Sequence, residues 1–329
     1  MALTISVYHE SFTLAEVFRI SRGEKTAAEV IRVIVSDGHF TGQGESVPYG
    51  RYGESIESVT AELESVKGKL RYVEDHALLP DLLKAGSARN ALDCAFWDLR
   101  AKISGKSVAE LTELTLPKMC VTAQTISVDS VENMQASARK LAGAPVIKVK
   151  LDPEAVVEKI AAIHQVTPNS QLIVDANEGW SVDVLKAVAD QLKTCNVVLI
   201  EQPLPAAEDA ALEGYECPIP LCADESCHTA DNLETLRKRY QSVNIKLDKT
   251  GGLSEAIDLL QRARELGFTV MVGCMVGTSL AMAPAYLLCE GAEFVDLDGP
   301  LLIADDRPNG FSFSAGKMWQ PSPFLWGVK

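Results

Sequence analysis

Hydrophobic and polar residues alternate with a two-residue period in several short segments of the second half of the chain. In residues 147–151 (IKVKL) the apolar side chains share one face and the two lysines share the other. Apolar residues likewise stand on the opposite face from Lys246, Asp224 and Asp296 in their own segments. This pattern predicts strands that pack one face on helices and carry charged groups on the other.

From about residue 120 onward, eight such strands alternate with helical patterns. The predicted strands are residues 121–126, 146–151, 172–175, 197–201, 221–224, 243–247, 269–273 and 294–298. Neighbouring parallel strands need a crossover connection between them, so this alternation predicts an α/β fold with a parallel sheet. No GxGxxG or GxxxxGK[ST] sequence follows any of these strands, so nothing supports a dinucleotide-binding or P-loop protein.

The first third of the chain has a different pattern. Residues 4–8 and 30–35 are β-prone and flank the polar stretch 21–26, which predicts a small antiparallel sheet with a mobile loop. In residues 88–99 apolar side chains recur at steps of three and four, which predicts an amphipathic helix. Pro117 then marks a boundary, so residues 1–115 are expected to form an α+β domain of their own.

Charged residues follow the predicted strands at a nearly constant interval. Lys150 to Asp175 is 25 residues, Asp175 to Glu201 is 26, Glu201 to Asp224 is 23, and Asp224 to Lys246 is 22. Each interval is the length of one strand–helix unit. In a closed barrel, equal positions on successive strands form a ring at one mouth, where active sites of such barrels are built. The interval therefore favours a barrel over an open sheet.

Asp175, Glu201 and Asp224 offer three oxygen ligands from adjacent predicted strands. A set of carboxylates without Cys or His suits Mg²⁺, one ion per subunit, with Mn²⁺ as a substitute. The alternative is that each acid caps the helix that follows it. Three acids at one register, with inward lysines on both sides, favour the metal site.

Lys150 and Lys246 are expected on opposite sides of this acidic group. A carboxylate bound to a metal acidifies the neighbouring C–H bond, and loss of that proton leaves an enediolate. Lysine can act as a base when nearby cations, here the metal and Lys148, lower its pKa. One lysine on each face would invert the carbon, which is racemisation or epimerisation. A Schiff-base aldolase and a non-catalytic metabolite-binding protein are the alternatives from other classes.

The chain composition limits the partners of the protein. A net charge of −14 over 329 residues argues against binding of nucleic acid or of anionic membranes. The longest apolar run, residues 280–289, is too short to span a bilayer and contains Pro284. The N-terminus does not have the pattern of a signal peptide, and the eight cysteines are scattered singly. We therefore expect reduced thiols and a cytoplasmic location.

Five segments of this sequence resemble the muconate-lactonizing subgroup of the enolase superfamily. They are Lys148-Val149-Lys150, Val174-Asp175-Ala176-Asn177, Glu201-Gln202-Pro203-Leu204, Ala223-Asp224-Glu225-Ser226 and residues 245–252 (IKLDKTGG). Residues 88–105 also resemble the helix of the N-terminal capping domain of that family. The resemblance implies a modified TIM barrel, (β/α)₇β, over residues 116–304. It also implies an N-terminal α+β capping domain over residues 1–115, to which residues 305–329 return.

Within that family the sequence is most similar to the dipeptide epimerases that act on L-Ala-D/L-Glu. Asp296-Leu297-Asp298 matches the DxD that holds the ammonium group of the dipeptide in those enzymes. Residues 22–25 (RGEK) and 48–54 (PYGRYGE) resemble the flaps that cover the substrate. An arginine of the first flap binds the side-chain carboxylate in those enzymes, and Lys25 stands at that position here. The further substrate contacts implied by the resemblance are Arg22, Tyr52, Thr125, Lys148 and Cys274, with Arg51 as a residue that would assist Lys25.

The resemblance implies a magnesium-dependent epimerase that inverts the Cα of the C-terminal residue of a small dipeptide by two-base 1,1-proton transfer. Other reactions of the subgroup remain as alternatives: N-acyl amino acid racemisation, o-succinylbenzoate synthesis and cycloisomerisation. These reactions do not need a DxD to bind an ammonium group. The preferred dipeptide, the number of subunits (a homo-oligomer included) and the lysine that serves each epimer stay open.

Overall fold

A long antiparallel ribbon begins the chain in the computed structural model, which describes residues 2–20 and 23–327. The ribbon pairs β1 (Thr4–Ile20) with β2 (Gly23–Ser36), and β3 (Thr41–Ser46) extends it to a three-stranded sheet. The predicted sheet is confirmed, but its strands are much longer than expected. Most of the stretch 21–26, predicted to be a loop, is strand, because Lys25 pairs with Phe18 as the ribbon continues past a bulge.

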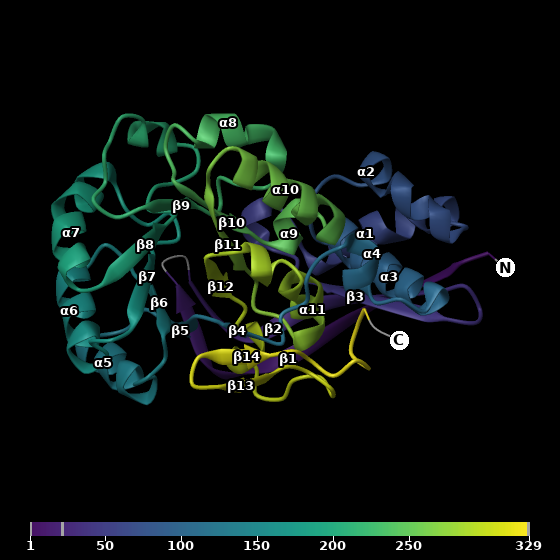
Figure 1. Cartoon of the computed structure of the whole chain (residues 1–329), viewed down its shortest axis with the longest axis horizontal. Helices are drawn as coiled ribbons and strands as arrows, with labels where there is room; N and C mark the ends of the chain where they lie inside the picture. The colour runs from purple at the N-terminus through teal and green to yellow at the C-terminus, as the bar shows by residue number, and fades with distance from the viewer. Residues whose placement is uncertain (1, 21–22, 328–329) are drawn as a thin grey trace.

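Helices cover one face of this sheet, on the right-hand side of Figure 1. They are α1 (Ile56–Val66), η2 (Lys67–Lys69), η3 (Val73–Leu78), α2 (Leu79–Leu82), α3 (Ser87–Ser104) and α4 (Val108–Thr112), after the short η1 (Gly50–Tyr52). The long helix α3 includes the predicted amphipathic segment. It lies so close to β3 that a Cβ at Gly42 would be 2.2 Å from the carbonyl oxygen of Ala95, so this contact requires glycine.

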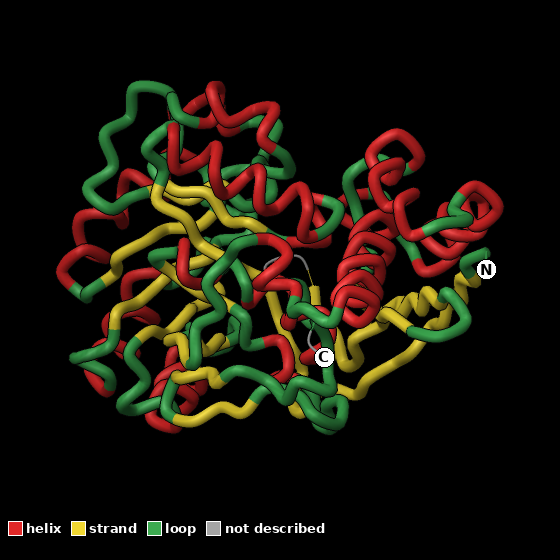
Figure 2. The backbone as a smooth tube through the Cα atoms, turned by 45° about the vertical axis from the view of Figure 1, so that its right-hand side comes forward, coloured by secondary structure: helices red, strands yellow, loops and turns green. Residues whose placement is uncertain are grey.

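Eight parallel strands, joined in sequence order, form the second part of the molecule. They are β5 (Gln124–Ile126), β6 (Val146–Lys150), β7 (Gln171–Asp175), β8 (Val197–Glu201), β9 (Leu221–Ala223), β10 (Ser242–Ile245), β11 (Thr269–Gly273) and β12 (Phe294–Asp296). The edges of this sheet approach each other where Ala123 N donates to Val295 O over 2.8 Å and Leu297 N to Thr122 Oγ1 over 3.0 Å. The result is a nearly closed barrel, as predicted (Figure 2).

Helices on the outside of the barrel make most of the crossovers. They are α5 (Val131–Lys140), α6 (Val156–Val166), α7 (Val182–Thr194), α8 (Leu233–Leu236) after η5 (Ala230–Asn232), α9 (Leu247–Thr250), α10 (Leu253–Glu265) and α11 (Ser279–Tyr286) with η6 (Cys289–Gly291). The β8–β9 crossover has only the short η4 (Asp209–Leu212). None of the helices in the described ranges is both long and apolar enough to cross a membrane.

Several strands end earlier than the sequence predicted. Residues 121–126 divide into β5 and a separate strand, β4 (Met119–Val121), which pairs with β14 (Lys317–Trp319) and β13 (Ser312–Ser314) in a small antiparallel sheet. Strand β10 ends at Ile245, so Lys246 is the N-cap of α9 rather than a strand residue. The predicted strands 221–224 and 294–298 end at Ala223 and Asp296.

Two layers of side chains fill the barrel near its carboxyl end. The lower layer holds an apolar cluster of Ile173, Leu199, Cys222 and Met271. Side chains two positions further along a strand point the same way, so this layer carries Asp175, Glu201 and Asp224 directly above it. Apolar packing thus supports the floor on which the charged groups stand.

The C-terminal segment returns to the first part of the molecule after η7 (Gly299–Leu302). Leu325 O accepts a hydrogen bond from Gln43 Nε2 over 2.9 Å, and Trp326 Nε1 donates to Cys94 O over 3.0 Å. Gly327 N donates to Asp98 Oδ1 over 2.8 Å. These bonds fasten residues 325–327 to β3 and α3, as Figure 1 shows where the chain ends beside them.

Candidate active site

Three carboxylates converge at the carboxyl end of the barrel strands. Asp175 ends β7, Glu201 ends β8, and Asp224 follows β9. One oxygen atom from each lies within 4.8 Å of the others, and all three residues are buried. The helices that follow have other N-caps, such as Ser181 for α7 and Glu208 for η4, so the alternative of three helix caps is wrong. Three hard oxygen donors at this separation fit a magnesium ion.

Two lysines flank this group from opposite sides. Lys150 Nζ, at the end of β6, lies 2.5 Å from Asp175 Oδ2, and Lys246 Nζ, just after β10, lies 2.6 Å from Asp224 Oδ2. Burial disfavours the ammonium form of Lys246, but Asp224 and Glu201 outweigh it and raise its pKa well above the usual value. The structure thus brings both of these predicted lysines next to the acids.

Lys148 lies beneath the acids, in the lower layer. Its ammonium group is 2.6 Å from Glu201 Oε2, 2.7 Å from Asp296 Oδ2 and 3.1 Å from Asp175 Oδ2. Burial opposes its charge, but the carboxylates, Asp296 foremost, raise its pKa well above the usual value. Lys148 is thus a fixed cation that holds acids together.

The carboxylates at the end of β12 are occupied by groups of the protein itself. Asp298 Oδ2 accepts a hydrogen bond from Thr125 N over 2.7 Å, and Asp296 pairs with Lys148. Burial, and then the neighbouring Asp296, raise the pKa of Asp298 to about 7. The structure therefore brings the predicted residues Thr125 and Asp298 into contact with each other.

A cavity of about 370 Å³ opens above the acids, between the barrel mouth and the N-terminal sheet. Its barrel wall includes Lys150, Asp224, Lys246 and Cys274, and its other wall includes Lys25, Tyr49, Arg51 and Tyr52. Lys148, Thr125, Asp296 and Asp298 do not belong to the described lining. Burial raises the pKa of the Cys274 thiol, so this residue forms part of the wall as a neutral group.

The covering wall is held by contacts between the two parts of the molecule. Arg51 Nε and Nη2 lie 2.6 and 2.7 Å from the two carboxylate oxygens of Glu178, a bidentate pair. The ring of Tyr52 packs edge-on against His228 with centroids 4.7 Å apart. Lys25 Nζ lies 5.1 Å from the centre of the Tyr49 ring, and burial lowers the pKa of this lysine. Arg22, the remaining predicted contact, lies outside the described residues.

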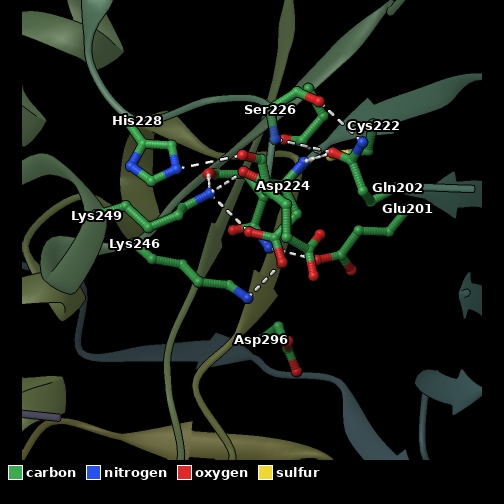
Figure 3. Close-up of polar contacts among 12 residues, drawn as sticks. Glu201, Gln202, Cys222, Asp224, Ser226, His228, Lys246, Lys249 and Asp296 are labelled. Atoms are coloured by element: carbon green, nitrogen blue, oxygen red, sulfur yellow. Dashed lines mark hydrogen bonds and ion pairs between the residues drawn. The ribbon is translucent and has the colours of Figure 1, made fainter. Parts of the chain in front are cut away.

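Sequence reasoning missed residues that hold the metal ligands from behind (Figure 3). Lys249 Nζ is fully buried and lies 2.6 Å from Asp224 Oδ1, whereas Lys246 contacts the other oxygen, Oδ2. Asn244 Nδ2 donates to Glu201 Oε1 over 2.7 Å. Asn244 stands two residues before Lys246, so the two-residue period of β10 was a signal that could have found it.

Comparison with known proteins agrees with this geometry over nearly the whole chain. The family described as Mandelate racemase / muconate lactonizing enzyme, N-terminal domain, matches residues 2–112, and Enolase C-terminal domain-like matches residues 131–316. An N-acetyl-D-glutamate racemase from Pseudoalteromonas sp is 49% identical over 91% of this chain and 95% of its own. The L-Ala-D/L-Glu epimerase of Escherichia coli K12 is 45% identical over 96% of this chain and 99% of its own.

Solved structures show the same fold with ligands bound. An enolase family member from Agrobacterium tumefaciens with homology to dipeptide epimerases, with bound sodium and L-Ala-L-Glu, is 45% identical, with a TM-score of 0.95 over 99% of this chain and 100% of its own. A dipeptide epimerase from Methylococcus capsulatus, complexed with Mg and L-Arg-D-Lys, is 28% identical, with a TM-score of 0.90 over 100% of both chains.

Proposed function

The chain belongs to the mandelate racemase/muconate lactonizing enzyme family of the enolase superfamily, and from this premise we propose that it is an epimerase of L-Ala-D/L-Glu type dipeptides. One observation carries the proposal. Three buried carboxylates within 4.8 Å of one another are flanked by Lys150, at the end of β6, and Lys246, just after β10, and both lysines line the cavity. This arrangement suits removal of a proton beside a carboxylate and its return from the other side.

Asp175, Glu201 and Asp224 would hold the magnesium ion. When bound, Mg²⁺ would draw charge from the substrate carboxylate, which makes the neighbouring C–H more acidic, and its positive charge would favour a neutral amine beside it. Lys150 contacts Asp175, and Lys246 contacts Asp224. Both lysines therefore lie within reach of a substrate bound at this centre.

The two lysines carry the proton transfer. One neutral lysine takes the proton from the Cα of the C-terminal residue, and the other, as an ammonium group, gives a proton to the opposite face. The carbon is inverted, and the two lysines exchange their protonation states. Exchange of protons with water then restores both, so deuterium from D₂O should appear at that carbon.

The cavity wall and the carboxylates behind it, at the end of β12, offer groups for the ends of a Glu-containing substrate. Lys25 would bind the side-chain carboxylate, as a point charge rather than the bidentate partner that an arginine provides. Asp298, with Asp296, would bind the ammonium group of the dipeptide after a rearrangement of the contact with Thr125. Cys274 would pack against the apolar part of the substrate, beside Tyr52.

Racemisation of N-acetylglutamate is the second candidate, favoured by the 49% identical relative from Pseudoalteromonas. An N-acetylated substrate has no ammonium group. Its α-carboxylate would bind at the metal centre, and its side-chain carboxylate would bind Lys25. The bond of Asp298 to Thr125 N, over 2.7 Å, is compatible with such a substrate, because the carboxyl already has a partner. The α-amino group is therefore the feature that separates the two candidates.

The test is incubation of the magnesium-loaded protein in D₂O with L-Ala-L-Glu and, separately, with N-acetyl-L-glutamate. We expect the dipeptide to gain one deuterium and its D-Glu epimer to form, with chelator stopping both and Mg²⁺ restoring them. Turnover of N-acetylglutamate alone would establish the second candidate. Inversion without deuterium uptake would reject the two-base scheme.

Asp298→Asn sharpens the distinction. Loss of a charged partner for the ammonium group should lower kcat/KM for L-Ala-L-Glu by roughly 10- to 100-fold, since a charged hydrogen bond contributes about 1.5–3 kcal/mol. The same change should leave N-acetylglutamate nearly unaffected. Asp305→Asn, at an exposed carboxylate outside the barrel, is the matched control.

All eight cysteines are free thiols, which suits the cytoplasmic location that we also propose.

A further inference from the structure

Gln202 follows the metal ligand Glu201 directly and is fully buried. Its backbone lies in the left-handed region, with φ of 34°, which is unusual for a residue other than glycine. Its N–H donates to Cys222 O over 2.8 Å, and its carbonyl accepts from Glu178 N over 2.9 Å. The chain after Glu201 is therefore held between β9 and the loop that follows β7.

The side chain of Gln202 reaches the loop that carries the next metal ligand. Its Oε1 accepts hydrogen bonds from Asp224 N over 2.9 Å and from Ser226 N over 3.1 Å, as Figure 3 shows. One residue thus joins Glu201, through the main chain, to Asp224, through its side chain. The two carboxylates repel each other, so their separation has to be held by such bonds.

The orientation of the Gln202 amide group is determined by the contacts of its nitrogen, Nε2. Nε2 lies 2.9 Å from Leu204 O, 2.9 Å from Ser226 Oγ and 3.0 Å from Tyr240 OH. Each of the two hydroxyl groups donates its single hydrogen bond to Asp209 Oδ2. The distance is 2.6 Å for Ser226 and 3.0 Å for Tyr240. They present only lone pairs to Gln202. The NH₂ group must therefore face them, and the oxygen must face Asp224.

Asp209 is the origin of this directed network. It is 1% exposed, and its other oxygen accepts a bond from Arg239 Nη1 over 2.6 Å. The arginine pairs with the buried carboxylate, whose other oxygen accepts hydrogen bonds from both hydroxyl groups. The donor and acceptor of every hydrogen bond between Asp209 and the backbone of Asp224 are therefore determined.

We propose that Gln202 is a positioning residue of the metal centre, which sets the spacing of Glu201 and Asp224, and that Asp209 orients it through Ser226 and Tyr240. None of these four network residues lines the cavity in the part of the chain that the structure describes. Residues that orient metal ligands typically contribute 10- to 100-fold to metal affinity. The inference rests on the metal site of the proposed function and is independent of the substrate.

The experiment measures the dissociation constant of Mg²⁺ alone by titration calorimetry on the full chain after treatment with chelator. Gln202→Leu removes every polar contact of the side chain, and Gln202→Glu places a carboxylate oxygen against the lone pairs of Ser226 and Tyr240. Both variants should bind Mg²⁺ about 10- to 100-fold more weakly than the original chain.

Gln241→Leu is the matched control. The Oε1 of Gln241 accepts a bond from Leu221 N over 3.0 Å, at the opposite end of the same strand, β9. This variant also loses a bond from a glutamine to β9, but it should keep the original affinity for Mg²⁺. An equal loss in the control, or an unchanged affinity in folded Gln202 variants, would overturn the proposal.

Tyr240→Phe keeps the test decisive if the Gln202 variants do not fold. It removes one acceptor of Nε2 and leaves Asp209 with Ser226 and Arg239. Affinity for Mg²⁺ should then fall roughly 2- to 10-fold, the loss of one neutral hydrogen bond. Unchanged affinity in this variant would also overturn the proposal. Because no substrate is present, a different substrate for the enzyme would leave this result intact.

Discussion

The floor of the cavity and its cover are built in different ways. The floor consists of charged groups at the ends of successive barrel strands, where Asp175, Glu201 and Asp224 are at most 1% exposed and each has a lysine within 2.6 Å. The cover comes from β2 and η1 of the N-terminal part. Its ion pair leaves the side chain of Arg51 39% exposed.

This difference separates chemistry from recognition. A buried charge without a partner is costly, so each group of the floor has a fixed neighbour and one geometry. The cover groups are partly solvated and are held by few contacts across the two parts of the molecule, so their replacement costs less. Reaction type should therefore depend on the floor, and recognition of the substrate side chain should depend on the cover.

The largest effect is expected on the floor, from removal of one base. Lys150→Ala or Lys246→Ala should lower the rate of epimerisation by about 10²- to 10⁴-fold, because in the proposed mechanism each lysine acts on one face of the substrate. Deuterium exchange without inversion should survive from one epimer only, a different one in each variant. Lys140→Ala, at an exposed lysine of α5, is the control. Full activity in either variant would refute the division of labour between the two lysines.

A smaller effect is expected where the two regions meet. Asp248 Oδ1 accepts bonds from Val47 N and Asn90 Nδ2, both over 2.9 Å, and burial, opposed by these bonds, raises its pKa to about 7. The folded state therefore holds the proton more tightly than the unfolded chain, where an Asp titrates near 3.9. The free energy of unfolding contributed by this group falls as pH rises from about 4 to 7 and is constant above.

Asp248→Asn keeps both bonds and removes this titration. The gain in the free energy of unfolding, measured in urea, should be about 2 kcal/mol larger at pH 8 than at pH 5.5. Asp258→Asn, at an exposed carboxylate of α10, should show no such difference. A gain independent of pH would mean that Asp248 is not protonated in the folded state near pH 6.

The smallest effect is expected on the cover. Arg51→Met keeps the length of the side chain but removes both bonds to Glu178, whose Oε1 still accepts from Ala206 N over 2.8 Å. KM for the dipeptide should rise roughly two- to fivefold, since a partly exposed ion pair contributes about 0.2–1 kcal/mol, and kcat should change little. Arg262→Met, which breaks exposed pairs with Glu234 and Glu265, is the control. A loss in kcat as large as that of Lys150→Ala would remove the contrast between floor and cover.

The floor could be predicted from the sequence because two periods specify it. The two-residue period of β6 turned Lys150 inward, and the length of a strand–helix unit placed Asp175 and Glu201 at the same height. These rules depend only on the local backbone, so the fold and the acidic group follow from them. The same rules could have identified Asn244.

Other features depend on tertiary contacts that neither the strand period nor the length of the strand–helix unit predicts. The side chain of Gln202 is directed by Asp209 through two hydroxyl groups, and His228 meets Tyr52 only because the cover folds over the barrel. Lys25 lies in a strand rather than a loop because the ribbon resumes after a bulge. Such positions follow from tertiary packing, and a single sequence does not contain a local signal for them.

The attachment of residues 325–327 has a consequence for synthesis on the ribosome. Asp98 is fully buried in α3, and one partner of its carboxylate, Gly327 N, stands 229 residues further along the chain. Although domains tend to fold as they emerge, the N-terminal region cannot complete its contacts until the entire barrel has been translated.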